Sequence, residues 1–288
     1  MQMIRFWKMQ SAGNDFIVIE AIQKPVYLTP WLIRRMCERR YGIGADQLLL
    51  VEPAQGDNEA DFRYRIFNAD GNEVEQCGNG ARCIGRFLLD TGLASGPVIV
   101  LRTARGLIAV QESRGNAMMV DMGEPIFDPA ALPSRCARRS KQGEAYLLPV
   151  GGMTVPVYVV SMGNPHVVTE VSSIQNAPVS SLGPLLENHI DFPLRTNVEF
   201  VETLDRQHIR YRVWERGVGE TLCCGSGACA AVVLGIVSGR LDMGTDIEVE
   251  ALGGHLWVRW DGPGSGVLLT GTVRKVFEGY LDVALLED

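Results

Sequence analysis

The sequence predicts an α/β protein made of two related halves. Its 288 residues are enough for about two domains of average size. Residues 62–67 alternate apolar and basic side chains with the period of a half-buried strand, and residues 209–214 repeat this pattern 147 positions later. At the same spacing, each strand leads to a Cys-Gly-x-Gly turn, at Cys77 and Cys224, and then to a helical pattern. Two copies of one α/β unit are the simplest explanation of these observations.

The other expected elements follow in order along the chain. A basic helix is expected over residues 31–40, and a second helix carries an apolar stripe at 81, 84, 87 and 88 before Gly92 ends it. Residues 228–237 are apolar on nearly every side and predict a buried helix. The Pro-Gly-Ser-Gly run at 263–266 predicts a hairpin loop. A weaker repeat relates residues 13–18 to 163–168, and turn and basic residues between 123 and 143 place the boundary near residue 122.

Composition and charge exclude several classes of protein. The formal net charge of −7 argues against a nucleic-acid-binding protein, which normally has a basic excess. The first fifteen residues show no apolar signal-peptide core, and the longest apolar run is far shorter than the roughly 20 residues of a membrane span. An odd set of seven cysteines argues against a secreted disulfide framework. We therefore expect a cytoplasmic protein that binds neither nucleic acid nor a membrane.

The duplicated turns indicate an anion site flanked by two thiols. A cysteine at a helix N-terminus faces backbone N–H groups and the positive end of the helix dipole, which lower the pKa of the thiol. The same N–H groups can hold a carboxylate, and the glycines let it approach closely. If the halves face each other, one thiol lies on each side of the Cα of a small amino acid. This arrangement suits stereoinversion, in which one group removes a proton and another supplies one to the opposite face.

Each cysteine also has a purely structural interpretation. A single cysteine is most often a small buried residue, but the matched duplication favours chemistry at Cys77 and Cys224. Cys223 adjoins Cys224, yet the repeat offset and the following Gly225 select Cys224. Cys136 is interpreted as an incidental free thiol. Core filling is expected for the remaining three, Cys37, Cys83 and Cys229.

No cofactor and no metal are expected. The sequence lacks Cys and His at the spacing of zinc ligands, and none of its four lysines adjoins a phosphate loop suited to pyridoxal phosphate. Residues 225–230 match the dinucleotide fingerprint, with Asp246 about where a ribose-binding acid belongs. Residues 216–224 separate these glycines from the strand, which weakens this oxidoreductase alternative. A redox-sensing protein with a disulfide between Cys77 and Cys224 is a third alternative.

Polar residues beside the repeats are candidate substrate contacts. Asn68 and Glu215 occupy the same repeat position, and Arg216 follows Glu215. An arginine can clamp a second carboxylate with two hydrogen bonds, and Glu215 can bind an ammonium group. Turn asparagines and Glu-Arg neighbours are also common on ordinary surfaces. His166 is either a buried core histidine or a group that tunes the pKa of a thiol.

Seven motifs together resemble the diaminopimelate epimerase family, in its order and spacing, from residue 6 to about residue 280. They lie at 13–16, 42–47, 67–71, 77–83, 163–166, 215–217 and 219–229. The resemblance implies a pseudo-symmetric fold in which each half is a rolled, mostly antiparallel sheet around a central helix, with the site in the cleft between the halves. It assigns residues 1–122 and 271–288 to the N-terminal half and residues 123–270 to the C-terminal half.

The resemblance also implies a reaction and the residues that perform it. The reaction is the cofactor-independent conversion of LL-2,6-diaminopimelate to the meso isomer, which supplies lysine and peptidoglycan synthesis. Cys77 matches the proton donor and Cys224 the acceptor, while His166 and Glu215 match positions thought to modulate the thiols. The positions that match the substrate-binding residues are Asn14, Gln47, Asn68, Gly78, Asn79, Asn164, Asn197, Glu215, Arg216, Gly225 and Ser226.

A related proline or hydroxyproline racemase is the nearest enzymatic alternative. Arg216 and Glu215 favour diaminopimelate, because proline lacks a second carboxylate and a second amine. The sequence departs from the family pattern at three places. Ser11-Ala12 precedes Gly13 where the family often has Gly-Leu, a change that we expect to be tolerated. Cys223 replaces the usual alanine and adds a competing disulfide partner, and Phe277 stands where the family often has tyrosine, near its dimer contact. We expect a homodimer.

Overall fold

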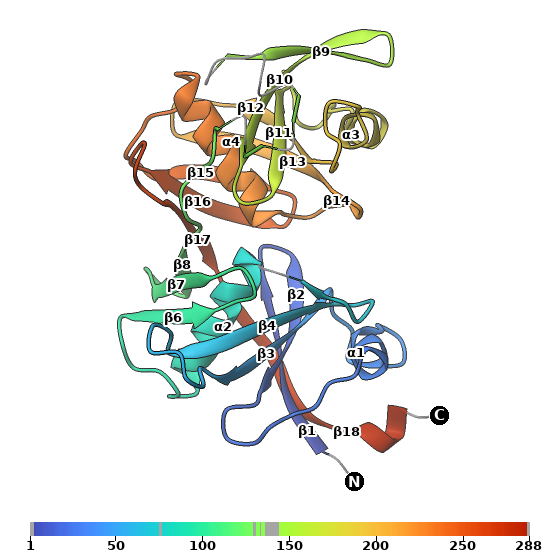
Figure 1. Ribbon diagram of the computed structural model, residues 1–288, viewed down its shortest axis with the longest axis vertical. Helices are drawn as coiled ribbons and strands as arrows, with labels where there is room; N and C mark the ends of the chain where they lie inside the picture. Colours follow the sequence, from blue (N-terminus) through green and yellow to red (C-terminus); the bar gives the residue numbers. More distant parts are fainter. Residues whose placement is uncertain (1–2, 75–76, 129–130, 133, 136–143, 287–288) are drawn as a thin grey trace. The chain divides into compact units, whose positions relative to one another are not determined.

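The computed structural model describes residues 3–74, 77–128, 131–132, 134–135 and 144–286. The chain divides into two compact units (Figure 1). Unit 1 is Met1–Val120 with Thr270–Asp288, and unit 2 is Asp121–Leu269. The C-terminal segment therefore belongs to the same unit as the N-terminus.

Unit 1 is a mixed sheet with both antiparallel and parallel strand pairs. Strand β18 pairs antiparallel with β1, and β1 with β2; β2 and β3 are parallel, β3 and β4 antiparallel, β4 and β6 parallel, and β6, β7 and β8 antiparallel. The elements are β1 (Met3–Ser11), β2 (Asn14–Glu20), α1 (Pro30–Cys37), β3 (Gln47–Pro53), β4 (Phe62–Asn68), β5 (Glu73–Val74), α2 (Gly78–Asp90), β6 (Val98–Arg102), β7 (Leu107–Glu112), β8 (Ala117–Asp121), β18 (Arg274–Asp282) and the 3-10 helix η2 (Val283–Leu286).

Helix α2 is the central helix of unit 1, and it packs against β1 to β4 and β7. The predicted apolar stripe is confirmed, because positions 81, 84, 87 and 88 are at most 1% exposed. The ring of Phe87 meets Trp7 edge to face, with ring centroids 4.7 Å apart. Gly92 follows the helix at φ 69°, a left-handed conformation that glycine adopts without strain.

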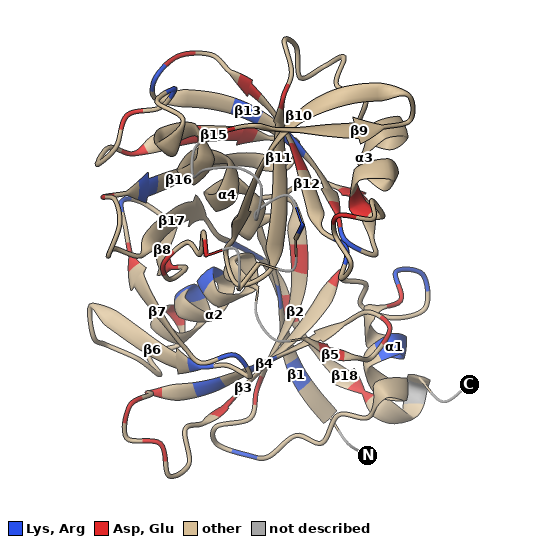
Figure 2. Ribbon diagram, turned by 45° about the horizontal axis from the view of Figure 1, so that its top comes forward, with Lys and Arg blue, Asp and Glu red and all other residues tan. Residues whose placement is uncertain are grey.

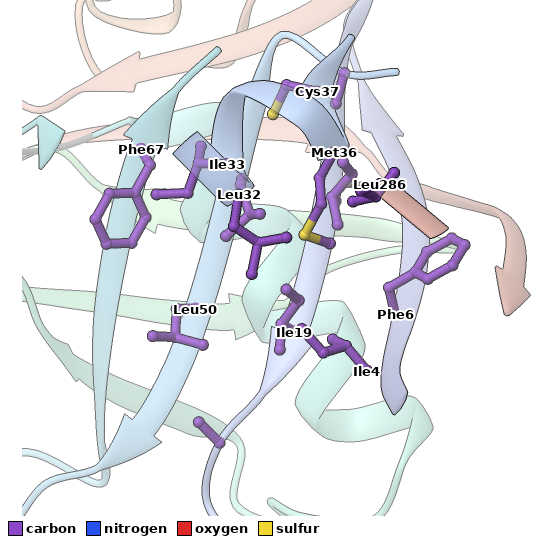
Figure 3. Close-up of a cluster of buried hydrophobic side chains, with 14 residues drawn as sticks. Ile4, Phe6, Ile19, Leu32, Ile33, Met36, Cys37, Leu50, Phe67 and Leu286 are labelled. Atoms are coloured by element: carbon purple, nitrogen blue, oxygen red, sulfur yellow. The ribbon is translucent and has the colours of Figure 1, made fainter. Parts of the chain in front are cut away.

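The sheet of unit 1 is covered on both faces. Leu48 and Leu50 of β3 join a cluster with Met36 of α1 (Figure 3). Leu49, between them, points to the other face, where a Cβ on Gly80 of α2 would lie 3.3 Å from it. Because successive side chains of a strand alternate between faces, α1 and α2 bury opposite sides of the same strand.

Helix α1 is shorter than the sequence predicts. It starts at Pro30, after Thr29 accepts a hydrogen bond from the N–H of Leu32, and it ends at Cys37 rather than at residue 40. Glu38 is extended, and its carboxylate accepts the N–H groups of Arg40 and Tyr41. This local side-chain contact replaces helical hydrogen bonds, so the prediction for residues 38–40 is wrong.

Unit 2 repeats the strand order of unit 1. Strand pairs β10–β11, β12–β13 and β15–β16 are antiparallel, whereas β11–β12 and β13–β15 are parallel. The same order of antiparallel and parallel pairs runs from β1 to β7 in unit 1. The elements are β9 (Tyr146–Val150), β10 (Met153–Ser161), β11 (Pro165–Glu170), α3 (Val179–Glu187), β12 (Asn197–Thr203), β13 (His208–Glu215), β14 (Gly219–Thr221), α4 (Gly225–Val237), β15 (Ile247–Ala251) and β16 (Gly254–Trp260). Strand β17 (Val267–Thr272) begins in unit 2 and ends in unit 1.

Helix α4 is the central helix of unit 2, and it packs against β10 to β13 and β16. All residues from Gly227 to Ile236 are buried, so the predicted core helix is confirmed. Helix α4 contains no Lys, Arg, Asp or Glu, and its ribbon in Figure 2 is tan, whereas α2 contains Arg82, Arg86 and Asp90. Helices α2 and α4 have the same length and lie 147 residues apart. The predicted fold class, a pseudo-symmetric α/β fold with a sheet around a central helix in each half, is therefore confirmed.

Among the described residues, no helix has both the length and the apolar character needed to cross a membrane.

Candidate active site

Cys77 is the N-cap residue of α2 in unit 1. Its backbone is extended, with φ −144°, and its Sγ accepts a hydrogen bond from the N–H of Gly80 at 3.4 Å. The buried hydroxyl of Tyr64 donates to the carbonyl of Cys77 at 3.3 Å. Helical N-termini leave N–H groups without helical partners, so the thiol lies where a negative charge is stabilised.

A buried network of amides and a guanidinium follows Cys77. Asn79 is 2% exposed, and its Nδ2 donates to Oδ1 of Asn14 at 2.6 Å. Arg82, which the sequence did not single out, is fully buried and donates to Oδ1 of Asn79 at 2.6 Å and to the hydroxyl of Ser11 at 3.0 Å. The network fixes the start of α2 against the end of β1 and the start of β2.

An ion-pair cluster holds the backbone beside Asn14. The carboxylate of Asp15 accepts two hydrogen bonds from Arg39, each 2.8 Å, and one from Lys8 at 2.6 Å. Arg39 also donates to Asp46, whose other oxygen accepts from Nδ2 of Asn14 at 3.2 Å. Burial raises the pKa of Asp15, but hydrogen bonds from Arg39 and Lys8 outweigh it and hold the pKa well below its usual range.

The other polar candidates of unit 1 lie at the same sheet edge. Gln47 begins β3 and is the register partner of Asn68 at the end of β4. Nε2 of Gln47 donates to Oδ1 of Asn68 at 2.9 Å. The structure therefore brings together two side chains that the sequence separates by 21 residues.

Cys224 is the N-cap residue of α4 in unit 2, at the repeat position of Cys77. The buried Tyr211 holds its backbone twice, because its hydroxyl accepts from the N–H at 2.8 Å and donates to the carbonyl at 2.9 Å. Tyr211 also lies 147 residues after Tyr64. The sequence showed both tyrosines inside the repeated strands, but only the structure shows that each holds the cysteine before a helix.

The thiol of Cys224 has a more protected environment than that of Cys77. It is 8% exposed, and its Sγ lies 3.4 Å from the hydroxyl of Ser226. Burial raises the pKa of Cys224 well above its usual value, and negative charge on Glu215 and Glu199 raises it further. Hydrogen bonds from Ser226 and from the N–H of Gly227 act in the opposite direction. A thiolate formed at Cys224 is therefore a strong base.

His166 is a buried and fully hydrogen-bonded histidine. Its Nδ1 lies 2.7 Å from Oε1 of Glu199, its Nε2 lies 3.0 Å from Oδ1 of Asn164, and both His166 and Glu199 are 0% exposed. Asn164 in turn donates from Nδ2 to the hydroxyl of Ser226 at 3.4 Å. Sequence reasoning missed Glu199, although it follows Asn197 by two positions and so points to the same face of β12.

The remaining candidates lie where β12 begins and β13 ends. Oδ1 of Asn197 accepts from the N–H of Arg216 at 2.9 Å, and the hydroxyl of Thr221 donates to Oε1 of Glu215. Arg216 is exposed, and its Nη1 donates to the carbonyl of Leu194 at 3.2 Å. The backbone near Arg216 is thus fixed to the substrate-binding candidate Asn197.

Cys37, Cys83 and Cys229 fill the core, as predicted. Cys83 and Cys229 are 0% exposed, and burial raises the pKa of Cys37 to about 12. Cys223 is buried, and its Sγ lies 3.3 Å from the hydroxyl of Tyr211. Cys136 lies outside the described residues. Within the described ranges there is no group of three or more His, Cys, Asp or Glu that could hold a metal ion.

A model of the diaminopimelate epimerase family matches residues 6–127 and 158–276 of the sequence. The chain belongs to this family. Two similar curated proteins carry the name diaminopimelate epimerase. That of Nitrosomonas eutropha is 50% identical over 283 residues, which cover 97% of this chain and 99% of the relative. That of Laribacter hongkongensis is 51% identical over 276 residues, which cover 96% and 98%.

Solved structures with lower identity share the fold of this diaminopimelate epimerase family member. A PhzF-family phenazine biosynthesis protein of Bacillus anthracis has a TM-score of 0.69 at 17% identity, covering 98% of this chain and 100% of its own. A probable proline racemase from Agrobacterium radiobacter has a TM-score of 0.69 at 16% identity, covering 97% and 93%. These similarities concern the fold alone.

Membership of the diaminopimelate epimerase family also excludes the dinucleotide alternative. In a dinucleotide-binding fold, a parallel strand runs directly into the glycine-rich turn. Here the strand before α4 is β14, which has three residues and is antiparallel to β13. The glycines at 225 and 227 instead form the first turn of a helix capped by a cysteine.

Proposed function

We propose that this protein converts LL-2,6-diaminopimelate to meso-2,6-diaminopimelate, with Cys224 as proton acceptor and Cys77 as proton donor. One observation carries the proposal: each unit places a cysteine at the N-cap of its central helix, at the same position of the repeat. Membership of the diaminopimelate epimerase family supports it. The reaction needs no cofactor, since both proton-transfer groups are side chains.

The helix N-termini bind the carboxylate next to the reacting carbon. The N–H groups of Gly78, Asn79, Gly225 and Ser226 belong to the first turns of α2 and α4, which lack helical acceptors. Preorganised donors at this carboxylate stabilise the negative charge that develops when Cα loses its proton. The same helix ends thus bind the substrate and lower the barrier to proton removal.

The two thiols act on opposite faces of one Cα. The thiolate of Cys224 takes the Cα proton, and the thiol of Cys77 donates a proton to the other face, which inverts the centre. The raised pKa of Cys224 supports its role as the base, because a Cα–H bond is a weak acid and needs a strong base. After one turnover the thiolate is on Cys77, and the reverse reaction starts from that form.

The polar candidates bind the rest of the substrate. We assign the distal carboxylate to Arg216, whose exposed guanidinium uses one N–H for Leu194. The distal ammonium lies near Glu215, and His166 and Glu215 modulate the thiols. The amide side chains that complete the proposed substrate site are Asn14, Gln47, Asn68, Asn164 and Asn197.

We further propose that residues 1–122 with 271–288 and residues 123–270 are the two halves of the enzyme, and that it is a cytoplasmic homodimer. The net charge of −7 supports a protein that binds neither nucleic acid nor anionic membranes. Exposed apolar side chains on β18, Val276, Phe277 and Tyr280, support a subunit contact there.

Turnover of LL-diaminopimelate in D2O tests the proposed function. We expect meso product that carries deuterium at one Cα, without added cofactor, and no racemisation of L-proline. NMR and chiral chromatography measure both outcomes. Absence of turnover by the folded protein, or turnover of proline instead, would contradict the proposal.

Replacing Arg216 tests the assignment of the distal carboxylate. We expect Arg216→Ala to lower kcat/KM for LL-diaminopimelate by about ten- to a hundredfold, since a charge-assisted hydrogen bond contributes about 1.5–3 kcal/mol. Arg259→Ala is the matched control, because Arg259 is also exposed in unit 2 and forms a local ion pair with Asp261 at 3.0 Å. Equal kinetics in the two variants would exclude this role for Arg216.

A further inference from the structure

A buried acid lies beneath the N-terminus of α4. Glu199 is 0% exposed, and a Cβ added to Gly227 would lie 2.7 Å from its Oε1. Oε1 contacts His166, whereas Oε2 is buried without a hydrogen-bond partner among the described residues. An ionised carboxylate is costly to bury in this way unless a cation or a proton compensates it. Its presence in the core needs an explanation.

The strand register shows which residues of unit 1 occupy the same places. In unit 2, His166 of β11 is the register partner of Asn197 of β12. In unit 1, Phe16 of β2 is the register partner of Gln47 of β3. Phe16 precedes His166 by 150 residues, and Gln47 precedes Asn197 by the same number. Phe16 is therefore the counterpart of His166.

The counterpart of Glu199 is apolar as well. Two residues along β12 from Asn197 comes Glu199, and two residues along β3 from Gln47 comes Leu49. The glycines above them agree with this match, because a Cβ on Gly80 would contact Leu49 just as one on Gly227 would contact Glu199. Unit 1 thus builds the same fold with a buried Phe-Leu pair. The His-Glu pair is not required by the architecture.

Hydrogen bonds connect this pair to the thiol of Cys224. Asn164 donates from Nδ2 to Ser226, so its Oδ1 is an acceptor and Nε2 of His166 must carry a hydrogen. Ser226 lies within hydrogen-bond distance of Cys224 Sγ. His166, Asn164 and Ser226 can therefore donate in series toward the sulfur. Such a chain stabilises a thiolate.

The same hydrogen bonds fix the proton between Glu199 and His166. With a hydrogen already on Nε2, the 2.7 Å contact at Nδ1 requires one more proton, held by either partner. The pair is an imidazolium with a carboxylate or an imidazole with a carboxylic acid. In both forms the pair is neutral as a whole, so the shared proton balances the negative charge on Glu199, which by itself raises the pKa of Cys224.

We propose that Glu199 is a positioning residue for the thiol of Cys224. It holds His166 with Nε2–H directed to Asn164, and the resulting donor chain stabilises the Cys224 thiolate. Phe16 and Leu49 provide no such chain at Cys77, so this pair makes the two thiols chemically unequal. The role in turnover rests on the proposed epimerase function, whereas the effect on the thiol does not.

Substitution at Glu199 tests the proposal through the pH dependence of thiol alkylation. Iodoacetamide labelling at low conversion, quantified by mass spectrometry, gives the midpoint for Cys224, with Cys77 as internal reference. We expect Glu199→Leu to shift the Cys224 midpoint upward by about one pH unit and to lower kcat about tenfold or more with KM within about twofold. In Glu199→Gln the new amide donates to Nδ1 of His166, so this variant should keep the Cys224 midpoint and kcat close to their wild-type values. The titratable groups that face Cys224 are Glu215 and Tyr211 of β13, Glu199 of β12 and the neighbouring Cys223.

Two further variants separate positioning from stability. The double change His166→Phe with Glu199→Leu reproduces the apolar pair of unit 1, so it should fold and still show the upward shift. Glu202→Gln, on the same strand, is the control that leaves the midpoint unchanged. A downward shift, an unchanged midpoint, or a Gln variant no better than the Leu variant would overturn the proposal. If the wild-type protein has no epimerase activity, the alkylation midpoints still decide it.

Discussion

We expect Cys77→Ala and Cys224→Ala each to lower kcat for epimerisation by about 10²- to 10⁴-fold, the usual contribution of a positioned acid or base. Inversion needs a proton acceptor on one face of Cα and a donor on the other, so neither thiol can replace its partner. Each variant should still bind substrate, because the backbone N–H groups of α2 and α4 do not depend on the sulfur atoms.

Deuterium exchange in D2O separates this mechanism from one with a single base. A variant with one remaining thiol should exchange the Cα proton of the isomer that the thiol faces and return it with retained configuration. Chiral chromatography with mass spectrometry measures exchange and inversion together. Cys83→Ala is the control, since Cys83 is buried in α2 away from its N-cap. Normal inversion in either catalytic-thiol variant would disprove the two-base mechanism.

We expect Gly80→Ala and Gly227→Ala to displace the thiols of Cys77 and Cys224, because each added methyl group would collide with a buried side chain beneath the helix. A Cβ at Gly80 would collide with the hydroxyl of Tyr64, and a Cβ at Gly227 would lie 2.7 Å from Oε1 of Glu199. Overpacking costs about 1–3 kcal/mol, and the higher helix propensity of alanine offsets at most about 1 kcal/mol. A displacement of the N-cap by about 1 Å should lower kcat by about 10²-fold.

Urea denaturation and epimerisation kinetics measure the two effects of these glycine variants. We expect a decrease in unfolding free energy of up to about 2 kcal/mol in both. Gly96→Ala is the control, because Gly96 is exposed and a Cβ there would meet only the carbonyl of Val98, at 3.4 Å. Wild-type kinetics in both helix variants would show that Tyr64 and Glu199 do not support the thiols.

The features predicted from the sequence are those that depend on order along the chain. Alternation at 62–67 and 209–214 indicated two equivalent strands, and the shared offset to Cys77 and Cys224 indicated two equivalent helices. Both predictions are confirmed, because the strands pair in the same order in each unit and the two cysteines are N-cap residues. Strand period and turn spacing are local properties, so they can be predicted without knowledge of tertiary contacts.

One helix boundary was predicted wrongly because two local contacts compete, and two buried charged residues were missed. The helical pattern at 31–40 continues past Cys37, but the carboxylate of Glu38 takes the next N–H groups and ends the helix. Glu199 was overlooked because a charged residue is usually exposed, although its spacing of two from Asn197 places both on one face of β12. Arg82 was overlooked for the same reason in α2.

The sequence by itself determined that two copies of one α/β unit each present a cysteine at a helix N-terminus, and it indicated the family. Only the tertiary structure decided how the two thiols differ. His166, Glu199 and Ser226 come from separate elements, and their contact depends on which face of each strand they occupy. Unit 1 folds the same way around Phe16 and Leu49, so packing requires only that these positions be filled. The hydrogen bonds that connect Glu199 to Cys224 form only after the chain has folded, because they join side chains of separate elements. Burial strengthens these hydrogen bonds, including the one between Glu199 and His166.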